Sequence, residues 1–324
     1  MDLEDTPVVE HILDVVDEEM AAPKKPKLLL FDVGGVCVSD LAGPDCRLQS
    51  NNFLTCPQVV SPFQAILDYE LSQGIPPGWV NYSISRTSPT GFWHRLETGS
   101  IPMDAAFFEG FKADLHDPSR WKAFYTAQRA KDPKLPKDIP PVPAMDTDWL
   151  FHEMIAVSKT PDPWMYPALQ ALRDSGEYML GALSNTVIFP PDHEFMKKYP
   201  QDPVRPMFDF FISSAHVGLR KPDPRIYELA LKKANEVAAE KAGSKRGRAF
   251  GWDAGIKKEE VLFFDDIGEN LKAAKQFGFG TVKVALGRTF EAVDELERVT
   301  GLGLAGTHPR IPVEPRRQPA KAKI

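Results

Sequence analysis

Five short apolar runs, separated by amphipathic stretches, set the pattern of the chain. The first, Leu28-Leu29-Leu30-Phe31, lies between Pro26 and Gly34-Gly35, and a continuous apolar run of this length is typical of a strand buried on both faces. Four more strands are predicted at 178–183, 208–213, 261–264 and 281–285, with helices at 167–175, 224–239 and 269–277. Strands that alternate with helices predict an α/β fold with a doubly wound parallel sheet.

Residues 61–159 do not follow that alternation. Ser61-Pro62 reads as a helix start, with a capping residue and a proline at the first helical position. Helices are predicted at 63–72, 91–97, 103–114 and 147–158. We therefore expect an acidic arm at 1–26, a core formed by 27–37 and 160–290, an irregular insert at 38–58, a helical cap at 59–159 and a tail at 291–324.

Composition narrows the class of protein. Hydrophobic residues make up 43% and charged residues 26% of the 324 residues, as in ordinary globular proteins. The formal net charge is -6, so the chain has no overall excess of positive charge that would bind nucleic acid, and no nucleic-acid partner is expected. No stretch reaches the roughly 18 apolar residues of a membrane helix, and residues 1–26 carry no apolar run of signal-peptide length. Cys37, Cys46 and Cys56 lack metal-ligand spacing and indicate a reducing compartment, so a cytoplasmic location is expected.

Polar residues that could take part in catalysis or ligand binding follow the predicted strands. Asp32 follows the first strand, and Ser184-Asn185 follows the second. Lys221 precedes the helix after the third strand, and Asp265-Asp266 ends the fourth, with Asn270 close behind. In a doubly wound sheet, ligands bind outside the carboxyl ends of the strands, so these residues are expected to meet at one site.

Those four segments resemble, in order, the four sequence motifs of the haloacid dehalogenase superfamily. The resemblance covers about residues 27–287 and points to the branch with a helical cap between the first two motifs, which includes the phosphatase domain of soluble epoxide hydrolases. It implies a magnesium-dependent hydrolase, and in particular a phosphatase acting on a small phosphorylated metabolite.

The resemblance also implies a nucleophile and a metal site. Asp32 would attack phosphorus and form an aspartyl-phosphate, which splits hydrolysis into two easier steps. Mg²⁺ prefers hard oxygen ligands, and the ligands implied here are Asp32, the backbone carbonyl of Gly34, and Asp266. Asp265 and Asn270 would orient those ligands.

The same resemblance assigns the phosphate-binding residues. Ser184 and Asn185 would donate hydrogen bonds to phosphate oxygens, and Lys221 would stabilise the negative charge of the transition state. Taken singly, each motif has a plainer reading, such as turn chemistry for Ser184-Asn185 or a surface position for Lys221. Their joint occurrence in order favours the functional reading. Substrate identity would depend on cap residues such as Trp93, Arg95 and Glu97.

Gly34 departs from the family pattern. Phosphatases of the superfamily usually carry a second aspartate at this position, two residues after the nucleophile, where it acts as general acid and base. Glycine cannot move a proton, so turnover is expected to depend on other groups or water. Two alternatives stay open. One is carbon–halogen cleavage on the same fold, which needs no metal. The other is a binding protein that has lost turnover.

The segment 38–58 also departs from the family pattern, because family members run quickly from the first strand into the cap. Removing it would join Cys37 to Val59 in the usual way. Its 21 residues correspond to 63 nucleotides. Val38-Ser39 is compatible with a splice donor, Leu54-Thr55 with a branch site and Gln58 with a terminal CAG. We interpret the segment as a retained intron translated in frame. The alternative is a natural loop insertion.

The chain ends in Ala322-Lys323-Ile324, which follows the small–basic–aliphatic pattern of the Ser-Lys-Leu peroxisomal address. The peroxisomal matrix is therefore an alternative to the cytoplasm. A flexible charged tail ending by chance in an aliphatic residue is the plainer explanation.

Overall fold

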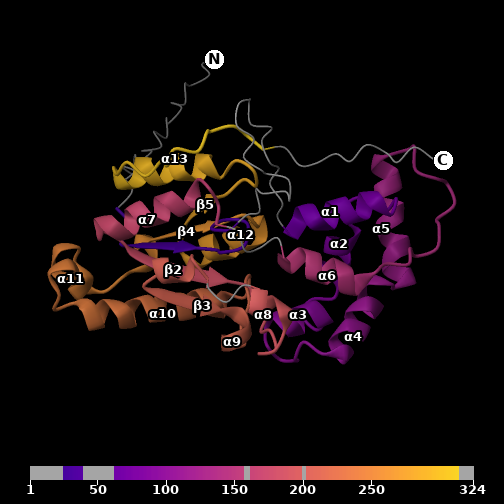
Figure 1. Ribbon diagram of the computed structural model, residues 1–324, viewed down its shortest axis with the longest axis horizontal. Helices are drawn as coiled ribbons and strands as arrows, with labels where there is room; N and C mark the ends of the chain where they lie inside the picture. Colours follow the sequence, from indigo (N-terminus) through magenta and orange to yellow (C-terminus); the bar gives the residue numbers. More distant parts are fainter. Residues whose placement is uncertain (1–24, 39–61, 157–160, 199–201, 314–324) are drawn as a thin grey trace, which may run out of the picture.

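The computed structural model describes residues 25–38, 62–156, 161–198 and 202–313, and within them it contains one parallel β-sheet. The strands run in the order β3-β2-β1-β4-β5. Their bounds are Leu28–Phe31 for β1, Met179–Ser184 for β2, Phe210–Ser213 for β3, Val261–Asp265 for β4 and Gly280–Lys283 for β5. This confirms the predicted α/β fold with a doubly wound sheet, because helices cover both faces (Figure 1).

Strand β1 lies at the centre of the sheet because every one of its side chains is apolar. Leu28 is paired with Met179 of β2 on one side and with Val261 of β4 on the other. Leu29 and Phe31 pack on one face, in a cluster with Leu169 of α7 (Met165–Ser175) and Leu296 of α13 (Thr289–Thr300). Leu28 and Leu30 pack on the other face, against α10 (Pro224–Lys241) and α12 (Gly268–Phe277).

Helix α13 corrects the predicted start of the tail at residue 291. It packs on the sheet through Ala292, Val293 and Leu296, so the core continues beyond 290. These residues and Thr300 recur at helical spacing, which is the amphipathic pattern that the sequence analysis missed.

Short helical segments complete the core. They are α8 (Glu194–Lys198), η1 (Arg205–Met207), α9 (Ser214–Val217), α11 (Lys245–Ala249), η2 (Trp252–Ala254) and η3 (Lys258–Glu260).

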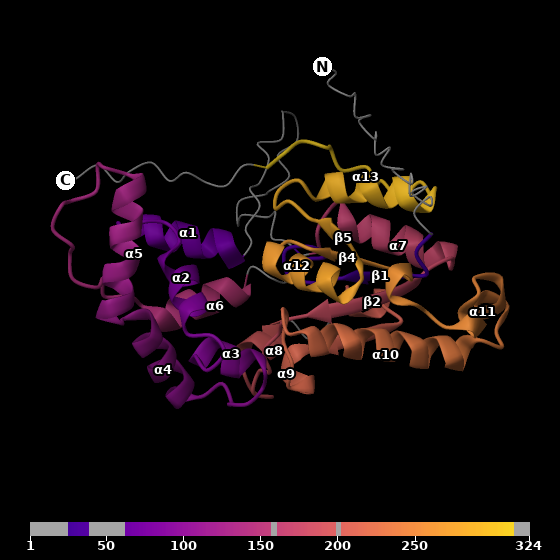
Figure 2. The ribbon, with the colours of Figure 1, turned by 180° about the vertical axis from the view of Figure 1, so that it is seen from behind.

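The segment between β1 and β2 forms a helical cap at one end of the sheet (Figures 1 and 2). Its helices are α1 (Pro62–Ser72), α2 (Trp79–Arg86), α3 (Phe92–Glu97), α4 (Ala105–Leu115), α5 (Pro118–Lys131) and α6 (Thr147–Ala156). They enclose a separate apolar cluster that includes Trp79, Phe107 and Phe151. The cap lies where a helical insert was expected.

Two cap helices, α2 and α5, were not predicted. The start of α5 is nevertheless local, because the Asp117 carboxylate accepts a hydrogen bond from the backbone N–H of Arg120 at 2.7 Å and Pro118 follows directly. The start of α2 is stabilised by a residue of another helix. There the buried Glu70 carboxylate of α1 accepts from the N–H groups of Gly78 at 2.6 Å and Val80 at 2.8 Å.

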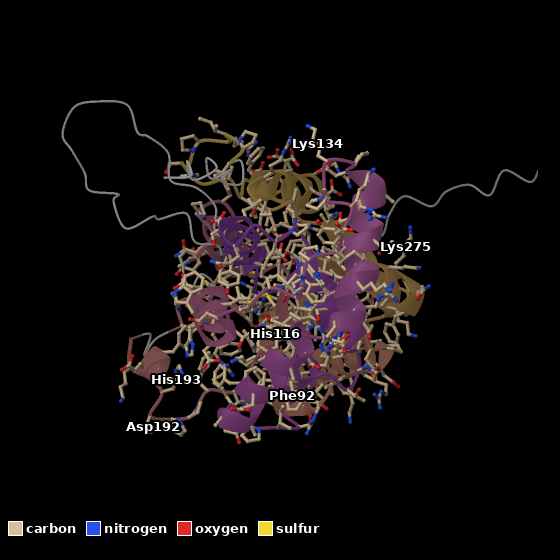
Figure 3. The ribbon with its side chains drawn as sticks, turned by 90° about the vertical axis from the view of Figure 1, so that its right-hand side faces the viewer. Phe92, His116, Lys134, Asp192, His193 and Lys275 are labelled. Atoms are coloured by element: carbon tan, nitrogen blue, oxygen red, sulfur yellow. The ribbon has the colours of Figure 1, made fainter. Side chains whose placement is uncertain are left out.

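A histidine links the end of α4 to the segment that enters α6. His116 contacts the carbonyl of Lys112 through Nδ1 at 2.6 Å, and its Nε2 accepts from the backbone N–H of Met145 at 3.0 Å. Figure 3 looks at the cap from outside and shows His116 among the side chains that fill the space between its helices.

The cap meets the core through α3. Nε of Arg220 donates to Glu97 at 2.7 Å, and the Ser214 hydroxyl donates to the Glu97 carbonyl at 2.6 Å. A Cβ atom placed on Gly99 would lie 2.1 Å from the carbonyl oxygen of Ala215, so glycine permits this close approach. His94 is buried at the same junction, and burial together with the Arg220 charge lowers its pKa to about 4.

The lowered pKa of His94 predicts that the free energy of unfolding decreases in acid. As the pH falls from about 6.5 to about 4, an unfolded chain protonates this histidine while the folded protein resists, so unfolding becomes easier. We expect the wild type to lose about 1–2 kcal/mol more stability over this range than His94→Gln does. Urea unfolding at pH 7, 5.5 and 4 measures the difference.

A matched variant at the exposed His152 serves as the control, because His152→Gln removes a histidine that is not enclosed. Parallel pH dependence of the wild type and His94→Gln would contradict the assignment.

Candidate active site

The predicted site residues meet at the carboxyl edge of the sheet. Phe31 pairs with Ala182 of β2 and with Phe264 of β4. Asp32 and Asp265, each one residue further on, therefore stand side by side, and the backbone N–H of Asp32 donates to the Phe264 carbonyl at 2.8 Å. Both carboxylates are buried. The parallel register thus brings together two acids that are far apart in sequence.

Lys221 joins these two acids. Its Nζ lies 2.8 Å from Oδ2 of Asp32 and 2.6 Å from Oδ2 of Asp265, and its side chain is fully buried. Burial acts to lower the pKa of the ammonium, but the charges of Asp265 and Asp32 outweigh it and raise the pKa above its usual value. Lys221 is therefore a fixed positive charge beside the predicted nucleophile.

Asn185 holds Lys221 through the backbone. Its Oδ1 accepts from the Lys221 N–H at 2.8 Å, and its Nδ2 donates to the Lys221 carbonyl at 3.1 Å. This contact gives Asn185 a positioning role in addition to the phosphate contact predicted from sequence. The Ser184 hydroxyl makes one long bond of 3.5 Å to the Asn185 carbonyl, which leaves it able to donate to a ligand.

Asp265 is held from three directions. Nδ2 of Asn270 lies 3.1 Å from each of its carboxylate oxygens, the Ile267 N–H donates to Oδ1 at 2.8 Å, and Lys221 contacts Oδ2. The orienting role that the family resemblance implied for Asp265 and Asn270 stays a prediction. Asp266 is half-buried, next to the cluster.

Three carboxylates share this edge. Oxygens of Asp32, Asp265 and Asp266 lie within 4.8 Å of one another. Burial raises the pKa of Asp32 to about 6 against the opposing charge of Lys221. Burial also raises the pKa of Asp266 well above its usual value, and the Asp32 charge adds to this.

These residues fit a magnesium ion. Three acids face one ammonium, so negative charge is in excess, and a divalent cation with hard oxygen ligands would relieve the repulsion. Asp32 and Asp266 would hold the ion. Gly34, whose carbonyl was predicted as a further ligand, follows Asp32 in the same turn and stays a prediction in that role.

Two glycines shape the turn after Asp32 in different ways. Gly35 has φ of +74°, and a Cβ atom placed on it would lie 2.5 Å from Oδ2 of Asp266. A Cβ atom on Gly34 would have no atom within 4 Å. The Cys37 thiol donates to the Asp32 carbonyl at 3.1 Å, and burial raises the pKa of that thiol well above its usual value.

Val38, assigned from sequence to the irregular insert, is instead buried in the core cluster and pairs with Gly34 and Pro161. The rest of the predicted insert, residues 39–58, lies outside the described residues. The acidic arm up to residue 24 and the last residues, 314–324, also lie outside them.

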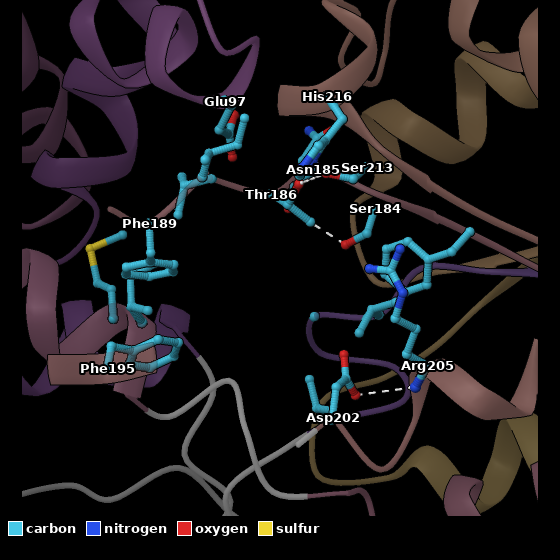
Figure 4. Close-up of a pocket in the computed structure, with 18 of the residues that line it drawn as sticks. Glu97, Ser184, Asn185, Thr186, Phe189, Phe195, Asp202, Arg205, Ser213 and His216 are labelled. Atoms are coloured by element: carbon cyan, nitrogen blue, oxygen red, sulfur yellow. Dashed lines mark hydrogen bonds between the residues drawn. The ribbon is translucent and has the colours of Figure 1, made fainter. Parts of the chain in front are cut away.

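A cavity of about 560 Å³ opens between the cap and this edge of the sheet. Figure 4 shows Ser184 and Arg205 on one wall and Phe189 and Phe195 opposite them. Trp93 and Glu97, named from sequence as specificity candidates, line the cavity. Arg95, the third, is absent from its lining and has its guanidinium over the Phe92 ring instead.

Several lining residues were missed by the sequence analysis. They come from the proline-rich stretch after β2 and include Val187, Ile188, Phe189, Phe195, Met196 and Arg205. The available signal was a set of large apolar residues between the predicted strands 178–183 and 208–213, outside any predicted helix or strand, and such a set of apolar side chains can mark a binding surface.

The chain belongs to the haloacid dehalogenase-like hydrolase family, whose pattern it matches over residues 26–278. This confirms the family resemblance found in the four motifs. Among characterised relatives, bifunctional epoxide hydrolase 2 from Sus scrofa is 38% identical over 109 residues, which is 34% of this chain and 16% of the relative. Acyl-CoA dehydrogenase family member 10 from Mus musculus is 25% identical over 288 residues, 87% of this chain and 20% of the relative. The chain thus spans a fifth or less of the length of these proteins.

Solved structures of the family are also similar to this chain. A family enzyme from Bacteroides thetaiotaomicron, in complex with magnesium and inorganic phosphate, is 18% identical with a TM-score of 0.41, over 83% of this chain and 98% of that one. A dehalogenase is 14% identical with a TM-score of 0.41, over 81% and 85%. Within the described residues, none of the helices has the length and apolar character needed to cross a membrane.

The geometry of Gly35 generates a prediction about the metal site. Gly35→Ala places a Cβ against Asp266 and forces a left-handed backbone on alanine. We expect a loss of about 1–2 kcal/mol in unfolding free energy and a roughly tenfold weaker affinity for Mg²⁺, measured by urea unfolding and titration calorimetry.

Gly34→Ala is the matched control, because its added methyl group meets no atom within 4 Å and should change neither quantity. Equal Mg²⁺ affinities in the two variants would show that Asp266 does not bind the ion.

Proposed function

We propose that this chain is a magnesium-dependent phosphatase that hydrolyses a phosphate monoester through an aspartyl-phosphate on Asp32. The observation that carries the proposal is the ionic cluster in which Lys221 contacts Asp32 and Asp265, beside Asp266 and next to the cavity under the cap. A buried carboxylate, a fixed positive charge and further acids for a cation are the parts that phosphoryl transfer requires.

The residues divide the work as follows. The Asp32 carboxylate attacks phosphorus, and the bond from phosphorus to the ester oxygen breaks as the new bond forms. Lys221 and the Ser184 hydroxyl stabilise the negative charge on the phosphoryl oxygens, while Asn185 fixes Lys221. Water then cleaves the aspartyl-phosphate, which releases inorganic phosphate and restores Asp32. A bound Mg²⁺ supplies positive charge and orients the phosphoryl group.

The leaving group needs a proton that Gly34 cannot supply. Within the described residues, no atom lies within 4 Å of a Cβ placed at Gly34, so the volume of the missing side chain is available to water or substrate. Solvent would then protonate the departing alcohol, which favours substrates with good leaving groups. The apolar lining of the cavity further favours an organic group with apolar surface on the substrate.

The absent acid also favours a second candidate, a binding protein without turnover. In that case the cluster would hold Mg²⁺ and a phosphorylated ligand with no hydrolysis. Carbon–halogen cleavage, the other candidate, would need no metal. The three clustered carboxylates fit a cation better than such a reaction requires.

The first test concerns Asp32. Asp32→Asn preserves the shape of the side chain and removes the nucleophile. We expect hydrolysis of 4-nitrophenyl phosphate in the presence of Mg²⁺ to fall by roughly three orders of magnitude or more. The thermal midpoint should fall, because Lys221 loses one of its two carboxylate partners, while a cooperative unfolding transition shows that the variant still folds. Chelation of Mg²⁺ should abolish wild-type hydrolysis.

The exposed Asp174 of α7 provides a matched control, since Asp174→Asn changes an acid outside the cluster. Full activity of Asp32→Asn, or activity that survives chelation, would exclude the proposed mechanism.

The second test concerns the missing acid. Gly34→Asp places a carboxylic acid at the cavity edge without a steric conflict at Cβ. We expect it to raise kcat for a substrate with a poor leaving group, such as an alkyl phosphate, by roughly tenfold or more. Steady-state release of inorganic phosphate measures the change.

Gly34→Asn is the control because it has the same size and cannot supply the proton. Equal rates in the two variants would mean that side-chain volume, and not proton transfer, sets the effect. An inactive wild type with an active Gly34→Asp variant would favour the binding protein.

A further inference from the structure

We propose that Arg205 forms a second anion site in the cavity, which binds a carboxylate on the substrate at a distance from the transferred phosphoryl group. The inference rests on the proposed function, because it assumes that the phosphoryl group binds at Asp32 and Lys221. It assigns the substrate class as phosphate monoesters of organic acids with an apolar body.

The position of Arg205 is built by its neighbours. It starts η1, where Asp202 accepts from the backbone N–H of Arg205 at 3.1 Å. The guanidinium lies over the ring of Phe211 from β3, 4.7 Å from its centroid. Stacking on an aromatic face orients a guanidinium while leaving its N–H groups free to bind. Figure 4 shows the side chain on the same wall as Ser184.

The charge of Arg205 has no carboxylate partner within the described parts of the chain. Glu97, which lines the same cavity, is paired with Arg220 at 2.7 Å. Oδ1 of Asp202 accepts hydrogen bonds from the backbone N–H groups of Val204 and Arg205, and no ion pair joins this carboxylate to the Arg205 guanidinium. A cation in a cavity with a largely apolar lining attracts an anion more strongly than one surrounded on all sides by water.

The anion bound there is distinct from the transferred phosphoryl group. Lys221 is buried against Asp32 and Asp265, and Arg205 has no ion pair with either acid. One guanidinium beside Asp202 suits a group of charge −1 better than a doubly charged phosphate, and its planar fork matches a carboxylate. Phe189 and Phe195 on the opposite wall supply the apolar contact for the body between the two anions.

The test compares two ligands that differ only at the second anion. One is 4-(phosphonomethyl)benzoic acid, whose phosphonate cannot be hydrolysed, and the other is its carboxylate methyl ester. Titration calorimetry with Mg²⁺ present measures both. We expect the wild type to bind the free acid roughly tenfold more tightly than the ester, and Arg205→Met to bind the two equally.

Two further variants sharpen the result. Arg205→Lys keeps the charge but loses the planar fork, so it should retain part of the preference. Arg298→Met removes an exposed arginine that pairs with Glu295 on α13, and it should keep the full preference. Arg205 is exposed in the cavity, and thermal unfolding will confirm that its variants fold.

Four results would overturn the proposal. The wild type could bind acid and ester equally, or it could bind neither ligand. The preference could survive in Arg205→Met, or that variant could lose affinity equally for both ligands, which would place Arg205 at the phosphonate. Hydrolysis of 4-nitrophenyl phosphate by the wild type, which needs no carboxylate on the substrate, tests the proposed function separately.

Discussion

The buried ammonium of Lys221 sets the conditions for the rest of the site. Taking an isolated charge out of water is strongly unfavourable, so this ammonium is tolerated only because Asp32 and Asp265 lie within 2.8 Å of it. Loss of one partner from a buried ion pair typically costs about 3–5 kcal/mol. The predicted nucleophile is therefore also part of what keeps the core electrically balanced, and its position is fixed by more than catalytic need.

Two neighbouring residues couple that cluster to the cap. Lys221 binds the acids of the core, while Arg220, one residue earlier, binds Glu97 of α3. Asn185 holds the Lys221 peptide from the end of β2 with two hydrogen bonds. The position of the cap, the end of β2 and the Lys221 ammonium thus depend on one short loop. Movement of the cap away from the core would break the Arg220–Glu97 pair next to Lys221, which gives cap closure a direct route to the site.

The cavity and the turn after Asp32 define the chemical character of the site. Gly35 must stay a glycine because of its positive φ and the nearness of Asp266, whereas Gly34 faces open space. The site therefore keeps the carboxylate predicted as the nucleophile and a cluster of acids that fits a metal, but that turn lacks a side chain that could protonate a leaving group. The proposed specificity then depends on both walls of the cavity, because Arg205 provides charge on the wall of Ser184 while Phe189 and Phe195 provide apolar surface on the opposite wall.

The sequence by itself determined the parallel sheet and the edge where the site forms. Continuous apolar runs such as 28–31 have no polar face, so they must be buried on both sides, and residues at their carboxyl ends must converge. Contacts between distant segments were decided only by the tertiary structure. Glu70 caps α2 from another helix, Asn185 binds a peptide 36 residues away, and Arg205 reaches the cavity from a proline-rich loop. Such contacts leave no periodic signal, because periodicity records which face of an element is buried and not which partner covers it.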